Sequence, residues 1–418
     1  MAELDNSIAL LAAVYHHRKA NPTTLSDELY YGLILKYFQR IKEAQEEGKP
    51  IAAASIAVPA EILLAMDIVP MSIEYFPMLL AATLNRQEEA LTTAKGYGMV
   101  PEICSAHRCL TGAVIMDWLP RPDMVIWSNM VCDNTVKCGD FIVDRFGSAP
   151  FFLDVPYRYT ERETLYLTQE LEDMVHFLEE QTHRKMDWDK FKGVIEQTRQ
   201  ELELHREIYE LRKAVPSPSR NRLAFQLWMA QMYYSGDPLA IPYLTSVRDE
   251  IKERVDAKKG YIEEENFRLL TLFLPPLARG NAILDWMERE HGAVMVADTH
   301  MSHWGKFEID PSKPLESIAR KCYNTPVCRQ MHGPLDEDVI DDVIRDAEDY
   351  KADGAIYYAH TGCRQACATI RTLKDALKKT VDIPMLTIDM DIIDPTFVSE
   401  EEVQDKLEGF FEILEDRK

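Results

Sequence analysis

The sequence predicts an α/β protein with two parallel sheets, because one order of segments occurs twice along the chain. Residues 123–132 read DMVIWSNMVC and residues 353–363 read DGAIYYAHTGC. Each segment is a short strand-forming run that begins after Asp and ends in Cys. Short apolar runs alternate with helical stretches of about 10–15 residues around both segments. This alternation is typical of parallel strands with helices on both faces of the sheet.

The predicted elements follow the same order in both halves. Residues 51–74 predict strand, helix and strand, and residues 269–300 repeat that order. In each case Pro follows the strand, where it can open a helix without losing a needed hydrogen bond; in the second half this is the pair 275–276. Residues 149–156 and 383–391 are apolar runs that lead to Asp, as buried parallel strands would. We therefore expect two related, doubly wound, Rossmann-like domains.

Two helical regions lie outside these repeats. The N-terminal residues have an apolar run behind an acidic start and no cleavage site, which predicts an amphipathic helix rather than a signal peptide. Residues 161–258 predict an inserted helical region, and its alternating charges indicate a solvated or partner-facing surface. The breaker PSPSRN begins at Pro216. The expected organisation is a helical segment, a first α/β domain with a helical extension and a second α/β domain: 1–48, 49–215 and 216–418.

Composition excludes several functional classes. The net charge of −23 over 418 residues argues against a nucleic-acid partner and against binding to anionic membranes. No apolar run reaches 18 residues, so no membrane span is expected. We expect a cytoplasmic protein, in which the eight cysteines stay reduced and form no disulfides.

Three of these cysteines stand where a ligand is expected. Ligands of open α/β sheets bind beyond the carboxyl ends of the strands, and Cys132 and Cys363 both lie there, one in each domain. Cys104 precedes a further predicted helix. Cys132 follows Cys104 by 28 positions and Cys363 follows Cys132 by 231, unlike the close pairs of structural zinc sites. Three separated thiolates fit an iron–sulfur cluster with one iron open to another ligand, and the alternative is three unrelated core residues.

The chain resembles the family of 2-hydroxyacyl-CoA dehydratase subunits and class I benzoyl-CoA reductase subunits, from about Lys49 to the C-terminus. The landmarks are VPAEILLAMDIVPMSIE, ICSAHRCLTG, RPDMVIWSNMVCDNTVK, HGAVMVAD, ADGAIYYAHTGC and IDMDIIDPTFVSEEEVQDKLEGFFEILE. The resemblance implies the larger, substrate-binding type of subunit, in which Cys104, Cys132 and Cys363 hold one 4Fe-4S cluster per chain. It also implies that Glu74 is a catalytic acid or base.

The resemblance further implies a reaction and two protein partners. The partners are a homologous second subunit, in a heterodimer or a homodimer, and a separate ATP-hydrolysing iron–sulfur activator that supplies one electron at low potential. The electron reduces a CoA thioester to a ketyl radical. The dehydratases are oxygen-sensitive lyases, and they then convert an (R)-2-hydroxyacyl-CoA to an enoyl-CoA. In the reductases, which are the alternative, the electron begins the reduction of an aromatic ring. The chain has no Gly-rich phosphate loop, which agrees with a separate activator.

The remaining cysteines have two interpretations. Cys109, Cys138 and Cys367 fall within or just beyond the first turns of the helices that follow the three ligands, so we predict that they pack against the sheets. The alternative is that they complete a double-cubane cluster in a reductase of small molecules. Cys322 and Cys328 match a variable loop of the family, where they border the cluster or are spectators.

Two other functional classes remain as alternatives. The motif DTHMSHW contains Asp298, His300 and His303, which are suitable metal ligands by type. We interpret the two histidines as residues that line the cleft or cap a helix, and the alternative is a mononuclear metal hydrolase. The last alternative is a non-catalytic scaffold that pairs with an active partner.

Overall fold

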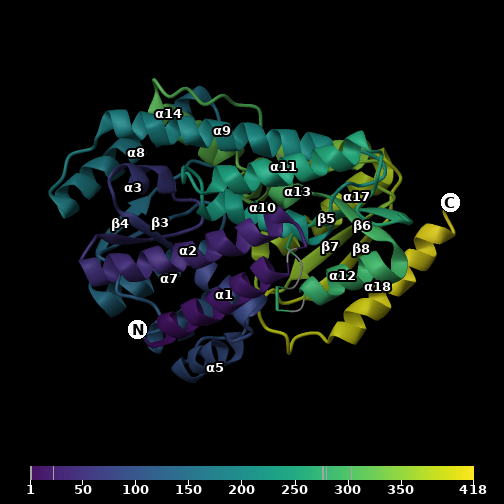
Figure 1. Ribbon diagram of the computed structural model, residues 1–418, viewed down its shortest axis with the longest axis horizontal. Coiled ribbons are helices and arrows are strands. Elements are labelled where there is room, and N and C mark those ends of the chain that lie inside the picture. The colour runs from purple at the N-terminus through teal and green to yellow at the C-terminus, as the bar shows by residue number, and fades with distance from the viewer. Residues whose placement is uncertain (1, 22, 275–276, 279, 303) are drawn as a thin grey trace.

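Two four-stranded parallel sheets form the two halves of the protein (Figure 1). The structure is a computed structural model that describes all residues except 1, 22, 275–276, 279 and 303. The sheet orders are β2-β1-β3-β4 and β6-β5-β7-β8, so the two halves share one topology, as the repeated segments predict. The strands are β1 Ile51–Ala54, β2 Val69–Ser72, β3 Met124–Ser128, β4 Ala149–Leu153, β5 Phe267–Leu272, β6 Ala293–Asp298, β7 Gly354–His360 and β8 Met385–Met390.

The strands are apolar runs because helices cover both faces of each sheet. Every residue of β1, β3, β5, β6 and β7 is buried, which is typical of parallel strands enclosed on both sides. The register pairs Ala54 of β1 with Ile126 of β3, and Leu272 of β5 with Tyr357 of β7. The carboxyl ends of the inner strands therefore lie at one edge in each sheet.

Helices make up most of the remaining chain. Residues 2–20 and 25–47 form two helices, α1 and α2, as predicted for a helical N-terminal segment. The predicted helix start at 275–276 lies outside the described residues. None of the described helices is long and apolar enough to cross a membrane. The helices are α1 Ala2–Ala20, α2 Leu25–Glu47, α3 Ala60–Ala65, α4 Tyr75–Leu79, α5 Gln87–Tyr97, α6 Ser105–Ile115, α7 Asp133–Phe146, α8 Glu161–Thr182, α9 Trp188–Arg212, α10 Arg222–Tyr233, α11 Ala240–Asp256, α12 Gly280–His291, α13 Thr299–Ser302, α14 Pro314–Asn324, α15 Pro326–His332, α16 Asp341–Asp349, α17 Arg364–Thr380 and α18 Glu400–Glu415, with π-helical turns η1 Leu80–Leu84 and η2 Leu335–Ile340.

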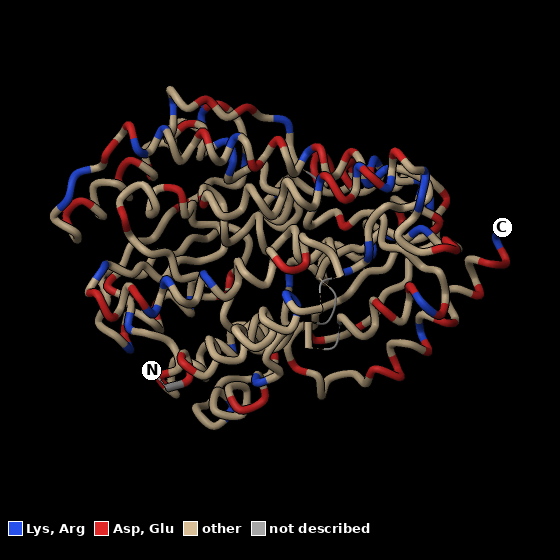
Figure 2. Tube along the Cα trace, viewed as in Figure 1, with Lys and Arg blue, Asp and Glu red and all other residues tan. Residues whose placement is uncertain are grey.

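The charged helix α9 has a solvated face, as its alternating charges indicate, and a buried face. Its outer face carries the alternating charges, which Figure 2 shows along the outer helices, and Arg199 pairs there with Glu196 and Glu203. Its inner face buries apolar residues such as Phe191, and its last residue, Arg212, is fully buried. The helix is thus a brace across both halves rather than a free surface.

One segment of the second half packs against the first. Helices α14 and α15 follow β6 in the chain, yet Ile318 and Cys322 share a hydrophobic core with Leu167 of α8. The Tyr323 hydroxyl donates a hydrogen bond to the Glu163 carbonyl oxygen at 3.1 Å. The packing of α14 and α15 against the first half holds the two halves together and brings α15 to the cavity described below.

Candidate functional site

The three predicted ligand cysteines line one cavity of about 90 Å³. Its walls come from the loops that follow β1, β3, β5, β7 and β8, and from α10 and α15. Cys104 immediately precedes α6, Cys132 precedes α7 and Cys363 precedes α17. The structure therefore brings together thiols from both halves of the chain, as the sequence predicts.

The helix N-termini favour negative charge on the three sulfurs. Backbone N–H groups of the first helical turns, from Ala106 and Thr135 among others, hydrogen-bond to the sulfurs of Cys104 and Cys132. Burial works in the opposite direction and raises the pKa of all three thiols, to about 12 for Cys363. The neighbouring thiols raise the pKa of Cys104 further. Three thiolates in this cavity therefore need a positively charged partner, which an iron–sulfur core provides, so the residues fit such a cluster.

His360, at the end of β7, contacts the first of these thiols. Its Nε2 lies 3.2 Å from the Sγ of Cys104, and its Nδ1 lies 4.0 Å from Asp391. Asp391 follows β8, accepts a hydrogen bond from Ser105 and lies 3.6 Å from Arg108. This polar network joins the two halves beside the cavity. His360 was not among the predicted site residues, although a His three positions before a predicted ligand, in AHTGC, was the available signal.

Gly362 is required by the close approach of the two halves at Cys104. A Cβ added at Gly362 would lie 2.6 Å from the Cys104 Cα and 3.0 Å from the His360 Nε2. Since the nearest atom belongs to the backbone, Gly362→Ala is expected to destabilise the protein by about 1–3 kcal/mol. A thermal unfolding scan measures the effect as a lower midpoint. The matched control is Gly96→Ala in α5, where a Cβ meets no described atom within 4 Å; its midpoint should stay or rise, and an equal fall in both variants would contradict the prediction.

Glu74, the residue expected to be a catalytic acid or base, lines the same cavity. It follows β2 and is 4% exposed. The Thr135 hydroxyl donates a hydrogen bond to its Oε1 at 3.1 Å, and the Nε2 of His107 lies 3.2 Å from the same hydroxyl oxygen. Burial raises the pKa of Glu74 to about 7 and lowers the pKa of His107 to about 4. Near neutral pH the site therefore holds a carboxyl group that can give or take a proton.

Two residues of the cavity wall adopt strained backbone conformations. Val131 has φ = 74° and Phe273 has φ = 67°, in the left-handed region that side chains other than Gly rarely occupy. Both line the cavity, one after β3 and the other after β5. Such conformations cost about 1–3 kcal/mol each and cluster at functional sites. Their position supports this cavity as the site.

The other cysteines lie outside the cavity wall. Cys109 and Cys138 are buried in α6 and α7, and Cys367 is exposed on α17. None of the three is among the described residues that line the cavity. This placement supports the packing interpretation for Cys109 and Cys138. The interpretation is wrong for Cys367, because that residue is exposed on α17. The double-cubane alternative stays untested. Cys322 and Cys328 belong to the core around α8.

The residues of the DTHMSHW motif do not form a metal site in the part of the chain that the structure describes. Asp298 binds the buried Arg212 at 3.2 Å, and the Nδ1 of His300 accepts a hydrogen bond from the Phe273 amide at 3.0 Å. His300 thus supports the loop after β5 and is not among the described residues that line the cavity, which was one of the two positions expected for it. His303 lies outside the described residues. No three described His, Cys, Asp or Glu residues are placed to hold one metal ion. That finding does not test a cluster, because its thiolates bind separate irons.

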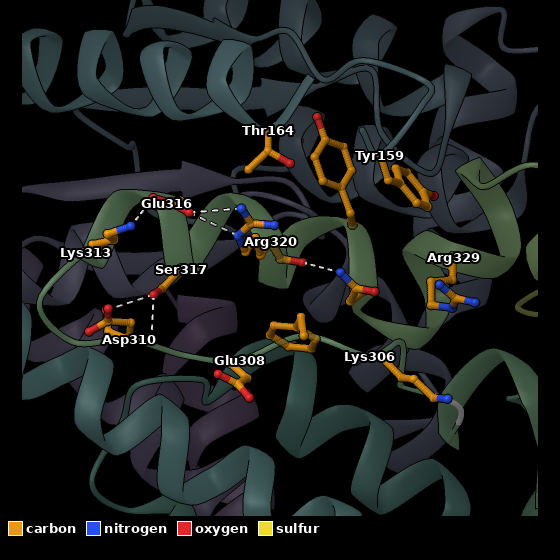
Figure 3. A pocket seen from close by; sticks show the side chains of 13 residues that line it. Tyr159, Thr164, Lys306, Glu308, Asp310, Lys313, Glu316, Ser317, Arg320 and Arg329 are labelled. Atoms are coloured by element: carbon orange, nitrogen blue, oxygen red, sulfur yellow. Dashed lines mark hydrogen bonds and ion pairs between the residues drawn. The ribbon is translucent and has the colours of Figure 1, made fainter. Parts of the chain in front are cut away.

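A larger cavity, of about 490 Å³, lies at α14 and holds polar side chains (Figure 3). Three of the cations that line it are paired: Arg320 with Glu161 and Glu316, Lys313 with Glu316 and Arg329 with Asp342. None of the described cysteines lines it. We therefore take the thiol cavity as the candidate active site.

The fold and the site define an α/β protein with three thiols and a buried carboxyl group in one cavity, at the carboxyl ends of two parallel sheets. Over residues 55–414 the chain matches the model of the family described as 2-hydroxyglutaryl-CoA dehydratase, D-component, and it belongs to that family. The resemblance found from the sequence is thereby confirmed.

Three relatives show how the family is represented among known proteins. A benzoyl-CoA reductase chain of Thauera aromatica, its B subunit, is 22% identical, over 72% of each chain. The (R)-phenyllactyl-CoA dehydratase alpha subunit of Clostridium sporogenes is 21% identical, over 90% of this chain and 92% of its own. The alpha subunit of lactoyl-CoA dehydratase of Anaerotignum propionicum is 22% identical, over 91% and 96%.

Proposed function

We propose that this chain is the iron–sulfur subunit of an ATP-activated enzyme that dehydrates an (R)-2-hydroxyacyl-CoA to an enoyl-CoA. The observation that carries the proposal is that Cys104, Cys132, Cys363 and Glu74 line one buried cavity. A second candidate is a chain of the benzoyl-CoA reductase type, because one relative carries that name. The dehydratase is preferred because the family description and two of the relatives name dehydratases.

Each group in the cavity has a role in this reaction. A 4Fe-4S cluster held by Cys104, Cys132 and Cys363 supplies an iron with an open position, which acts as a Lewis acid toward a substrate oxygen. The backbone N–H groups of α6, α7 and α17 stabilise the thiolates, and His360 can donate a hydrogen bond to the Cys104 sulfur. Glu74 exchanges the proton that the departing hydroxyl group takes up or that the neighbouring carbon loses.

The proposal includes two protein partners. The names of all three relatives describe one subunit of a larger enzyme, which supports a homologous second subunit here. A separate ATP-hydrolysing iron–sulfur activator supplies the electron.

Iron analysis and an assay test the proposal together. Protein purified without oxygen is expected to contain about four irons and four acid-labile sulfides per chain, with a 4Fe-4S-type EPR signal after reduction. Together with its second subunit, the activator and ATP, it should form an enoyl-CoA from a 2-hydroxyacyl-CoA. About eight irons would indicate the double cubane, and turnover of benzoyl-CoA alone would indicate the reductase. Absence of iron would contradict all three and leave the scaffold alternative.

A further inference from the structure

We propose that the thiol cavity selects acyl groups with an uncharged aliphatic or aromatic side chain and discriminates against acyl groups that carry a second carboxylate. The inference rests on the proposed function and narrows its substrate class. It concerns this chain in particular, because the description of its family names a dicarboxylic acyl group, 2-hydroxyglutaryl.

Much of the cavity wall is apolar. The apolar part is formed by side chains from both halves of the protein and from α10 and α15, which are Ile56, Met78, Trp228, Phe273, Leu274, Val327, Met331 and Ile392. A hydrocarbon chain or a ring placed against this wall leaves water and gains contact with it. The wall is therefore complementary to an apolar acyl group.

Lys and Arg are absent from the described residues that line the cavity. Two cations on neighbouring segments are already paired. Arg108 lies 3.6 Å from Asp391, and Arg329, in α15, lies 3.0 Å from Asp342. A terminal carboxylate in the cavity therefore meets no cation among the described residues that line it.

The two histidines that line the cavity do not supply this charge either. His107 contacts the Thr135 hydroxyl through Nε2, and His360 contacts the Cys104 sulfur through Nε2.

A second carboxylate would therefore have no cationic partner among the described residues that line the cavity. Removing an ionised carboxylate from water is costly unless a cation or several hydrogen bonds replace the water. Glu74 shares the cavity, so a second carboxylate there either is repelled by an ionised Glu74 or holds Glu74 in its protonated form. Both effects act against a dicarboxylic acyl group, while an acyl group that ends in methyl or phenyl avoids them.

The test compares two thioesters that differ only at the end of the chain. Pentanoyl-CoA ends in a methyl group where glutaryl-CoA has a carboxylate, and both lack the 2-hydroxyl group, so neither is dehydrated. Titration calorimetry on the anaerobically purified protein should show pentanoyl-CoA binding at least ~10-fold more tightly. A Met331→Lys variant places a cation in the wall and should narrow or reverse the preference. Met331→Leu, which keeps the wall apolar, should retain it.

The outcomes separate this inference from the proposed function. Equal binding of the two thioesters by the unmodified protein, or tighter binding of glutaryl-CoA, would overturn the inference while leaving the proposed function intact. A Met331→Lys variant with unchanged binding of both thioesters would also overturn it, because the missing cation would then not decide selectivity. Failure of both thioesters to bind would overturn the proposed function itself.

Discussion

Cys363→Ala is expected to remove most of the iron from the purified chain, from about four to below about one per chain, and to abolish turnover. Cys363 is one of three thiols in the cavity, and α17 begins directly after it. A cubane held by two protein thiolates loses a third of its anchors, and its exposed iron is lost to solvent and oxygen. Iron analysis of anaerobically purified protein measures the effect, and Cys104→Ala and Cys132→Ala should behave alike.

The control for this prediction lies one helical turn away. Cys367 is exposed on α17 and lies outside the cavity wall, so Cys367→Ala should keep its full iron content. Unchanged iron in Cys363→Ala would contradict the assignment of the ligands. Iron loss in Cys367→Ala, Cys109→Ala or Cys138→Ala would instead favour a double cubane.

Glu74→Gln is expected to lower kcat by about 10²–10⁴-fold, because the amide keeps the shape of the side chain but cannot exchange the proton. The iron content should not change, since Glu74 is not one of the three thiol ligands. A pH–rate profile provides the sharper measurement. The unmodified enzyme should show an apparent pKa near 7 that the variant lacks.

The same substitution should stabilise the fold at alkaline pH. Burial raises the pKa of Glu74 from 4.5 to about 7, so between these values the folded state binds more protons than the unfolded state. The free energy of unfolding therefore falls as pH rises through this window, and the penalty is complete above about pH 7. Glu74→Gln removes a penalty of up to about 3 kcal/mol. Its thermal midpoint should exceed that of the unmodified protein at pH 8 and match it at pH 4.

A matched control for Glu74→Gln is Glu88→Gln, at an exposed position of α5, which should leave kcat and the midpoint unchanged at both pH values. An unaltered pH–rate profile in Glu74→Gln would show that another group carries the proton. A midpoint difference that stays constant between pH 4 and pH 8 would show that the carboxyl group is not neutralised by burial.

The sequence by itself determined the fold class, the eight strands and the positions of the thiols relative to these strands. These features depend on short segments of neighbouring residues. The apolar strands β3 and β7 end shortly before Cys132 and Cys363, and the helices α7 and α17 begin directly after these cysteines. The carboxyl ends of parallel strands lie at one edge of a sheet, so the thiols of each half could be placed there without knowledge of the other half.

Only the tertiary structure decided how the two halves meet. The contact between His360 and Cys104 joins residues 256 positions apart. The need for glycine at position 362 follows only from the folded structure, in which the Cys104 backbone lies against it. The packing of α14 and α15 against the first half could likewise not be predicted from the sequence. An amphipathic pattern shows that a helix has a buried face, but it does not show which core covers that face. The raised pKa of Glu74 and the apolar part of the cavity wall were also decided only by the tertiary structure. Both depend on desolvation by residues from distant segments, and the order of the chain does not record which segments these are.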